Sequence, residues 1–202
     1  MDLPTLLTFV FSFFLIALSP GFCMTLSMTL GISIGVRRTL WMMAGELTGV
    51  FLVGAASFAG VTALMMNYPQ IFITAKFAAA AFLVYSGVKA WRAPTHVDGK
   101  NPNATLTRRQ LAAQGFLTAT SNPKAWIFLA ALLPAFIDAE QSIIPQAAIM
   151  LSVMVVIEFI SLLIYASGGK ALKVMLTNRG LGHWLNRISA SLMFGIAIWL
   201  LL

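Results

Sequence analysis

The chain has 202 residues, of which 59% are hydrophobic and only 9% are charged. A mean hydropathy of +0.89 and repeated apolar runs long enough to cross a bilayer exclude an ordinary soluble domain and predict an all-α polytopic membrane protein. The formal net charge of +7 would suggest nucleic-acid binding in a soluble protein, but here the basic residues fall between the apolar runs. We therefore relate them to membrane topology and expect no nucleic-acid partner.

Six transmembrane spans are predicted, and together they form a single transmembrane domain over residues 1–202. The first apolar run lacks a basic leader and a small-x-small cleavage motif, which favours a span over a secretory signal. The hydrophilic segment 92–110 is the longest loop, and it divides the chain into halves at about 1–92 and 109–202. The predicted spans are 3–34, 40–66, 70–91, 111–135, 145–168 and 187–202.

Two short proline-containing motifs lie deep inside apolar runs. Proline removes a backbone N–H and frees the carbonyl four residues earlier, which here belongs to Ile16 or Ala119. A capping residue followed by proline is typical of a helix start, so we predict that the first and fourth helices are broken at Pro20 and Pro123 and that these breaks build a binding site. A simple proline kink is the alternative for each motif. The motif residues are Ser19, Pro20 and Gly21 in the first span and Asn122, Pro123 and Lys124 in the fourth.

Four charged residues fall inside predicted spans, away from the span ends: Glu46, Glu158, Lys76 and Lys124. An ionised side chain costs ~2.5–3.5 kcal/mol or more at the bilayer centre, so both glutamates should face the bundle interior. Either they couple transport to protons or bind a substrate ammonium, or they are protonated or paired carboxyls that stabilise helix contacts. Lys124 either meets a substrate carboxylate beside a half-helix N-terminus or pairs permanently with a glutamate. Lys76 is expected to extend its ammonium group toward the interface.

The glycines, the cysteine and the histidines indicate how the helices pack and which kinds of site the sequence lacks. Gly45 and Gly49 form a small-xxx-small pair beside Glu46, which predicts the close approach of another helix backbone. Cys23 is the only cysteine, which rules out an intrachain disulfide and a cysteine metal cluster, and we expect it to be a small buried residue. No metal-ligand spacing and no Ser-His-Asp or Cys-His set is visible, and the two histidines fall in predicted loops. The sequence therefore argues against an enzyme and predicts neither a cofactor nor a metal.

Lysine and arginine are distributed unequally between the two sides of the membrane. Of the 13 lysines and arginines, all except Lys76 and Lys124 lie in or beside the loops that join spans one and two, three and four, and five and six. By the positive-inside rule these loops are cytoplasmic, so both termini are predicted to be periplasmic. Trp41, Trp91 and Trp184 fall where the cytoplasmic interface is expected.

The two halves of the chain resemble each other in the order of their marked residues. Pro20 corresponds to Pro123, and Glu46 in the second span corresponds to Glu158 in the fifth. Three spans per repeat is an odd number, so the second copy must be inverted in the membrane, an arrangement typical of alternating-access transporters. The predicted fold is therefore six transmembrane helices arranged as two inverted three-helix repeats.

The motifs also resemble those of a known family. The segment 122–136, which begins Asn-Pro-Lys and reaches Pro134 after an apolar run, closely resembles the fourth-span motif of the LysE/RhtB amino-acid exporters. The residues 19–21 are similar to the first-span signature of that family, and 82–91 is similar to the end of its third span. The likeness extends over essentially the whole chain. The chain departs from the family pattern at Phe22 and Cys23, where a second proline and a polar residue are usual, which leaves the identity of the substrate open.

The resemblance implies a secondary transporter of the bacterial inner membrane that exports amino acids or related small zwitterionic metabolites in exchange for protons. Its predicted partners are the small-molecule substrate and membrane lipid, and its oligomeric state is open, with a homodimer as one option. Two alternatives remain: a cation or metal-ion carrier that uses the intramembrane glutamates, and a non-transporting membrane scaffold. The predicted substrate site comprises Ser19, Pro20, Gly21, Glu46, Asn122, Pro123 and Lys124, with Glu46 and Glu158 as proton-coupling residues.

Overall fold

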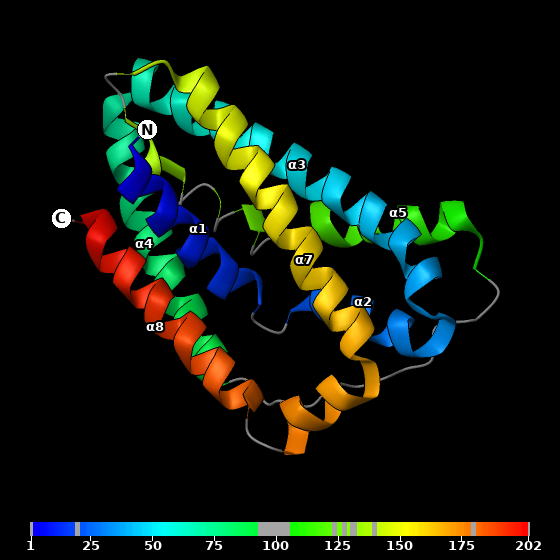
Figure 1. The fold of residues 1–202 in the computed structure, drawn as a ribbon. Coiled ribbons are helices and arrows are strands. Elements are labelled where there is room, and N and C mark those ends of the chain that lie inside the picture. The colour runs from blue at the N-terminus through cyan, green and yellow to red at the C-terminus, as the bar shows by residue number, and fades with distance from the viewer. Residues whose placement is uncertain are drawn as a thin grey trace.

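The computed structural model describes residues 2–18, 21–92, 106–122, 125, 126, 129, 133–138, 141–178 and 181–201. Over these residues the chain is helical apart from short connections and contains no strand, which confirms the predicted all-α class (Figure 1). The helices are α1 (Leu3–Ala17), α2 (Phe22–Ile34), α3 (Val36–Asn67), α4 (Pro69–Arg92), α5 (Arg108–Thr120), the 3₁₀ helix η1 (Leu133–Phe136), α7 (Ile143–Asn178) and α8 (Leu181–Leu201).

Within the described residues, two helices are long and apolar enough to cross a membrane, at Val36–Gly60 of α3 and Ile143–Gly169 of α7. A third candidate span is formed by α1 and α2 together, with a bend of 59° at the break between them. These three coincide with the predicted second, fifth and first spans. Helices α4 and α8 occupy the positions of the predicted third and sixth spans, and they lie against each other (Figure 1).

Two segments that we predicted as loops are helical, so those predictions were wrong. The residues 108–110 form the first turn of α5, which begins in a capping box: the Gln110 N–H donates to the Thr107 hydroxyl (3.3 Å) and the Thr107 N–H donates to the Gln110 side chain (2.8 Å). The chain between the predicted fifth and sixth spans is helical to Asn178 and again from Leu181, so the exposed His183 lies in α8 rather than in a loop. The lysines of this segment lower its hydropathy without breaking a helix.

Gly169 marks the point where α7 changes direction. Its φ of 45° and ψ of −125° lie outside the helical region, in backbone space that favours glycine. The helical residues that follow turn away from the axis of the long helix, as the orange segment of Figure 1 shows. The candidate span in α7 therefore ends at Gly169.

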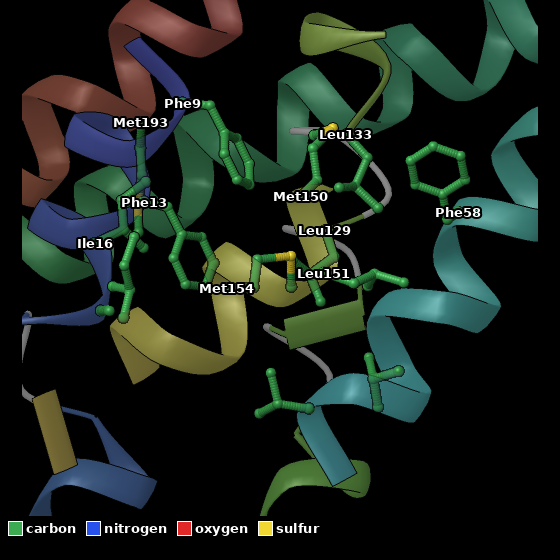
Figure 2. Close-up of a cluster of buried hydrophobic side chains, with 14 of the residues drawn as sticks. Phe9, Phe13, Ile16, Phe58, Leu129, Leu133, Met150, Leu151, Met154 and Met193 are labelled. Carbon is green, nitrogen blue, oxygen red and sulfur yellow. The ribbon is translucent and has the colours of Figure 1, made fainter. Parts of the chain in front are cut away.

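Buried apolar side chains form two separate clusters. Figure 2 shows most of cluster 1, in which Phe9 lies against Phe13 and meets the ring of Phe136 edge-on at 5.3 Å between centroids. Cluster 1 consists of Phe9, Phe13, Ile16, Ala17, Val50, Val53, Phe58, Ala80, Ala119, Leu129, Leu133, Met150, Leu151, Met154, Ile157, Met193 and Ala197. Cluster 2 consists of Cys23, Met24, Met28, Leu30, Met42, Met43, Leu111, Leu162, Tyr165 and Ala166.

Glycines bring helix backbones into direct contact at two places. A Cβ on Gly45 would collide with the carbonyl oxygen of Ala112, and a Cβ on Gly115 would collide with the carbonyl oxygen of Met42, so α3 and α5 touch through their backbones. This contact confirms the close approach predicted from the small residues beside Glu46. In the same way, a Cβ on Gly31 of α2 would collide with the backbone of Ala166 in α7.

We expect Gly115→Ala to lower the midpoint of thermal unfolding, measured on the purified protein in detergent. Overpacking of a close backbone contact costs typically ~1–3 kcal/mol. The matched control is Gly60→Ala, because a Cβ on Gly60 meets no atom within 4 Å. In the control, the change should raise the midpoint slightly, since a helical glycine is less favourable than alanine by roughly 0.5–1 kcal/mol. Equal shifts in the two variants would contradict the close contact between α3 and α5.

Candidate functional site

The two predicted intramembrane carboxylates meet inside the bundle. Glu46 on α3 is 0% exposed and Glu158 on α7 is 9% exposed. The carboxyl group of Glu46 lies beside that of Glu158 and beside the thiol of Cys23, which begins α2. Neither oxygen atom of Glu46 has a hydrogen-bond partner within 3.5 Å in the part of the chain that the structure describes. The carboxyl group of Glu46 is therefore buried without the hydrogen-bond partners that such groups normally require.

This carboxyl pair lies where cluster 1 and cluster 2 meet. Along α3 the buried side chains change from cluster 2 to cluster 1 on passing Glu46, and along α7 they change from cluster 1 to cluster 2 on passing Glu158. The glutamates are thus a polar layer between two apolar ones, close to the middle of both candidate spans. The side chains in this order are Met42, Glu46 and Val50 on α3, and Leu162, Glu158 and Met154 on α7.

The break between α1 and α2 lies at the same level, because α1 contributes to cluster 1 and α2 to cluster 2. Helix α1 ends at Ala17, and α2 begins at Phe22 after Gly21, whose extended backbone (φ −146°, ψ −176°) makes no side-chain cap. The first helical hydrogen bond of α2 runs from the Thr25 N–H to the Gly21 carbonyl at 2.8 Å. Among the described residues, the N–H groups of the first turn of α2 therefore have no acceptor.

Two side-chain hydrogen bonds attach this broken span to α7. The Tyr165 hydroxyl donates to the carbonyl oxygen of Leu18, at the end of α1, over 2.8 Å. The Ser27 hydroxyl donates to the carbonyl oxygen of Leu162, also over 2.8 Å. Tyr165 and Leu162 lie on the same face of α7 as Glu158, since they follow it by seven and four residues. The bonds therefore hold the break against the helix face that carries Glu158.

The second break follows α5, which ends at Thr120. We predicted that the carbonyl of Ala119 would be freed, but it accepts a hydrogen bond from the Asn122 N–H at 3.3 Å, because the chain tightens into a turn before Pro123. The Asn122 carbonyl accepts from the Ala125 N–H at 3.0 Å, which starts a new turn. The indole N–H of Trp126 donates to the Thr120 carbonyl at 2.9 Å, so this helix end is satisfied from within the chain.

The structure brings together only part of the predicted site. Glu46 and Glu158 meet, Gly21 caps α2, and Asn122 starts the turn after α5. Ser19, Pro20, Pro123 and Lys124 lie outside the described residues, as does the side chain of Lys76. Sequence reasoning assigned Cys23 to the apolar interior and missed that it faces Glu46. The position of Cys23 in the first turn after the predicted break could have indicated that it lies beside the predicted site.

No three His, Cys, Asp or Glu side chains in the described residues are grouped so that they could hold a metal ion. Cys23, Glu46 and Glu158 lie in one region of the bundle, but they do not form such a group. The arrangement can chemically accept protons or an organic cation, because both need only carboxyl oxygens without a fixed coordination geometry.

Known proteins give consistent matches. The family described as LysE type translocator matches residues 14–202. The homoserine/homoserine lactone efflux protein of Salmonella typhimurium is 32% identical over 157 residues, which cover 76% of this chain and 74% of that protein. The leucine efflux protein of Enterobacter sp. is 26% identical over 199 residues, which cover 94% and 92%. An uncharacterized membrane protein of Vibrio cholerae is 27% identical over 199 residues, which cover 96% and 95%. No solved structure gives a significant match.

We expect Tyr165→Phe to lower the thermal unfolding midpoint in detergent, because it removes the hydroxyl that satisfies the Leu18 carbonyl. A buried polar group that loses its partner costs about 1–3 kcal/mol. Tyr85→Phe is the matched control, since Tyr85 is 61% exposed. If both variants unfold at the same temperature as the parent protein, the hydrogen bond does not hold the break against α7.

Proposed function

The chain belongs to the LysE type translocator family, and from this premise we propose that it exports amino acids or related small zwitterionic metabolites across the bacterial inner membrane in exchange for protons. The family consists of transporters, so the chain is not an enzyme. The named relatives are efflux proteins for homoserine, homoserine lactone and leucine, and this range supports a small amino acid or a close derivative as the substrate.

The observation that carries the proposal is the buried carboxyl pair of Glu46 and Glu158. Ionised groups are retained inside a membrane bundle when they meet a charge, either a fixed partner or a passing one. In the described residues no basic side chain lies against Glu46. Its neighbours are the Cys23 thiol and the Glu158 carboxyl, and neither of its oxygens has a hydrogen-bond partner within 3.5 Å. A proton and the ammonium group of a substrate can each bind to these carboxyl groups for part of the transport cycle. One pair of carboxyl groups can therefore exchange a substrate for a proton.

We propose that the substrate lies between the two helix breaks, so that Ser19, Pro20, Gly21, Asn122 and Pro123 surround it. Glu46 then faces the ammonium group of the substrate, and Glu46 with Glu158 carries the coupling proton. Lys124 is proposed to face the substrate carboxylate; a permanent pair between Lys124 and a glutamate is the alternative. The uncapped first turn of α2 supports this arrangement, because it leaves N–H groups at one break.

Six transmembrane helices in two inverted repeats, with both termini periplasmic, are part of the same proposal. The contact between α4 and α8 supports the repeats, because these helices occupy equivalent places in the two halves. Two cation–π pairs support the orientation: the Arg108 guanidinium lies 5.3 Å from the ring of Trp41, and the Arg187 guanidinium lies 5.4 Å from the ring of Trp91. Both pairs join residues that the sequence assigns to the cytoplasmic interface.

Two other functions make different demands on the same residues. A cation or metal-ion carrier would need the glutamates but not Lys124, and it would respond to metal ions rather than to amino acids. A membrane scaffold would tolerate neutralisation of both glutamates. Matches to named efflux proteins along most of the chain favour the amino-acid exporter over both.

We expect Glu46→Gln and Glu158→Gln each to abolish amino-acid efflux while the protein still inserts into the membrane. Loss of a charge contact worth ~3 kcal/mol where water cannot replace it lowers affinity more than a hundredfold. The measurement is efflux from preloaded proteoliposomes with an imposed proton gradient, across a panel that includes leucine and homoserine, at matched protein level.

Asp2→Asn is the control for this experiment, because Asp2 is an exposed carboxylate that caps α1 and asparagine caps helices equally well. Its efflux should equal that of the parent protein. Undiminished efflux by both glutamate variants would remove the carboxyl pair from the mechanism, and efflux that survives an uncoupler would remove the proton coupling.

The orientation has a separate test. A reporter enzyme fused after residue 100 should be active only as a cytoplasmic reporter, and one fused after residue 140 only as a periplasmic reporter, because Lys and Arg gather in the loops on the first side. A cytoplasmic signal from residue 140 would contradict both the orientation and the inverted repeats.

A further inference from the structure

We propose that two Arg-Arg pairs, on the first turns of α3 and α5, form a binding site for the headgroup of an anionic phospholipid beside Trp41. The pairs are Arg37 with Arg38 and Arg108 with Arg109. The inference goes beyond the proposed export function, because it concerns the lipid-facing surface and is independent of the compound that is carried. The proposed orientation places this site in the cytoplasmic leaflet.

The first turns of α3 and α5 lie side by side. The Arg38 guanidinium donates to the Leu106 carbonyl at 2.8 Å, and the Arg108 guanidinium lies 5.3 Å from the ring of Trp41. Further along, the two backbones touch at the glycine contact described above. The two helices therefore begin at the same level, and two of the four arginines hold their starts together.

No acidic residue within either helix start offsets these four positive charges. The sequence has no Asp or Glu in residues 3–45 or 99–137, and Asp98 in the preceding loop is accompanied by Lys100. The capping box of α5 uses the neutral Gln110, where glutamate would serve equally well. Positive side chains are unfavourable beside the positive end of a helix dipole, and the C-terminus of α2 offsets only part of that charge. The excess positive charge attracts an anion from outside the chain.

The other two arginines, Arg37 and Arg109, are available for that anion. Both are exposed, and neither makes a hydrogen bond or ion pair with the residues that the structure describes. Arg37 lies one turn before Trp41, and Arg109 lies one turn before Ala112, which meets Gly45 of α3. Each arginine is therefore on the side of its helix that adjoins the other helix. Guanidinium groups bind phosphate oxygens through paired N–H donors, so phosphate is the fitting ligand.

The surface beyond the arginines favours a lipid over a soluble phosphate. Trp41 is 44% exposed, and tryptophan concentrates at the level of the lipid headgroups. Further along, large apolar side chains are exposed on both helices: Phe51 and Leu52 on α3 and Leu117 on α5. One phospholipid can contact the arginines through its phosphate and this apolar surface through its acyl chains. A zwitterionic headgroup carries its own ammonium group, so an anionic headgroup such as phosphatidylglycerol matches the excess positive charge better.

The experiment titrates the purified protein in detergent with phosphatidylglycerol and follows the midpoint of thermal unfolding, which rises as a ligand occupies the folded protein. Phosphatidylcholine is titrated as a lipid without net charge, and glycerol 3-phosphate as a soluble phosphate. The test variant is Arg37→Gln with Arg109→Gln, which leaves the Arg108–Trp41 pair in place.

The matched control is Lys89→Gln with Arg92→Gln. These exposed residues lie in the last turn of α4, on either side of Trp91, so the control loses the same charge beside another tryptophan. They differ from the test pair because positive charge is favourable at a helix C-terminus and needs no external anion there.

We expect phosphatidylglycerol to raise the midpoint of the parent protein more than phosphatidylcholine does, and glycerol 3-phosphate to leave it unchanged. In the test variant, the phosphatidylglycerol concentration that gives half of the shift should rise roughly twentyfold, since one arginine near anionic headgroups contributes about fivefold in affinity. In the control it should change less than about twofold.

Three results would overturn the inference. Equal losses in the two variants would show a general attraction between basic residues and anionic lipid. An equal shift with glycerol 3-phosphate would show a site for soluble phosphate, and equal shifts with the two lipids would show no preference for an anionic headgroup. If the test variant does not fold, the single variants Arg37→Gln and Arg109→Gln decide, with about a fivefold loss expected for each and an unchanged affinity in both as the contrary result. The measurement needs no transported compound, so a failure of the proposed export function leaves it intact.

Discussion

The rest of the structure depends on the burial of two carboxyl groups against each other in an apolar bundle. A carboxylate without a partner in such a place is costly, so helices that carry one at mid-span must bring it to a neighbour, a donor or a mobile charge. Here Glu46 and Glu158 come from different helices and meet at the boundary of two apolar clusters. The broken first span passes that boundary at the same level, and Cys23 begins its second half there.

Breaking a helix inside a membrane creates backbone groups that need partners. The structure satisfies the carbonyl ends of both breaks from within the protein: Tyr165 reaches Leu18, and Trp126 reaches Thr120. The N-terminus of α2 differs from these carbonyl ends, because its first-turn N–H groups have no acceptor among the described residues. Carbonyl ends are thus closed and one N–H end is left open, an asymmetry that favours an anionic ligand over a cationic one at the break itself.

Sequence predicted the local features well, because hydropathy and helix period act over a few residues. The spans around α3 and α7 and the small residues at Gly45 and Gly49 were recognisable for that reason. The helix after Gly169 was missed, because its lysines were read as a loop although they are good helix formers. The partner of the glycine pair, Gly115, and the contact of Cys23 with Glu46 depend on how distant helices meet, and no local pattern encodes that.

The glycine contacts also determine which parts of this protein can slide past one another. Helices α3 and α5 touch backbone to backbone through Gly45 and Gly115, and α2 and α7 do so through Gly31 and Ala166. Each pair has no side-chain layer between its backbones to absorb a shift, so we expect each pair to move as one body. Glu46 belongs to one body and Glu158 to the other. Any rocking of the two bodies would therefore change the distance between the two carboxyl groups. A proton or cation held by both groups would in turn favour the arrangement of the helices in which that distance is short.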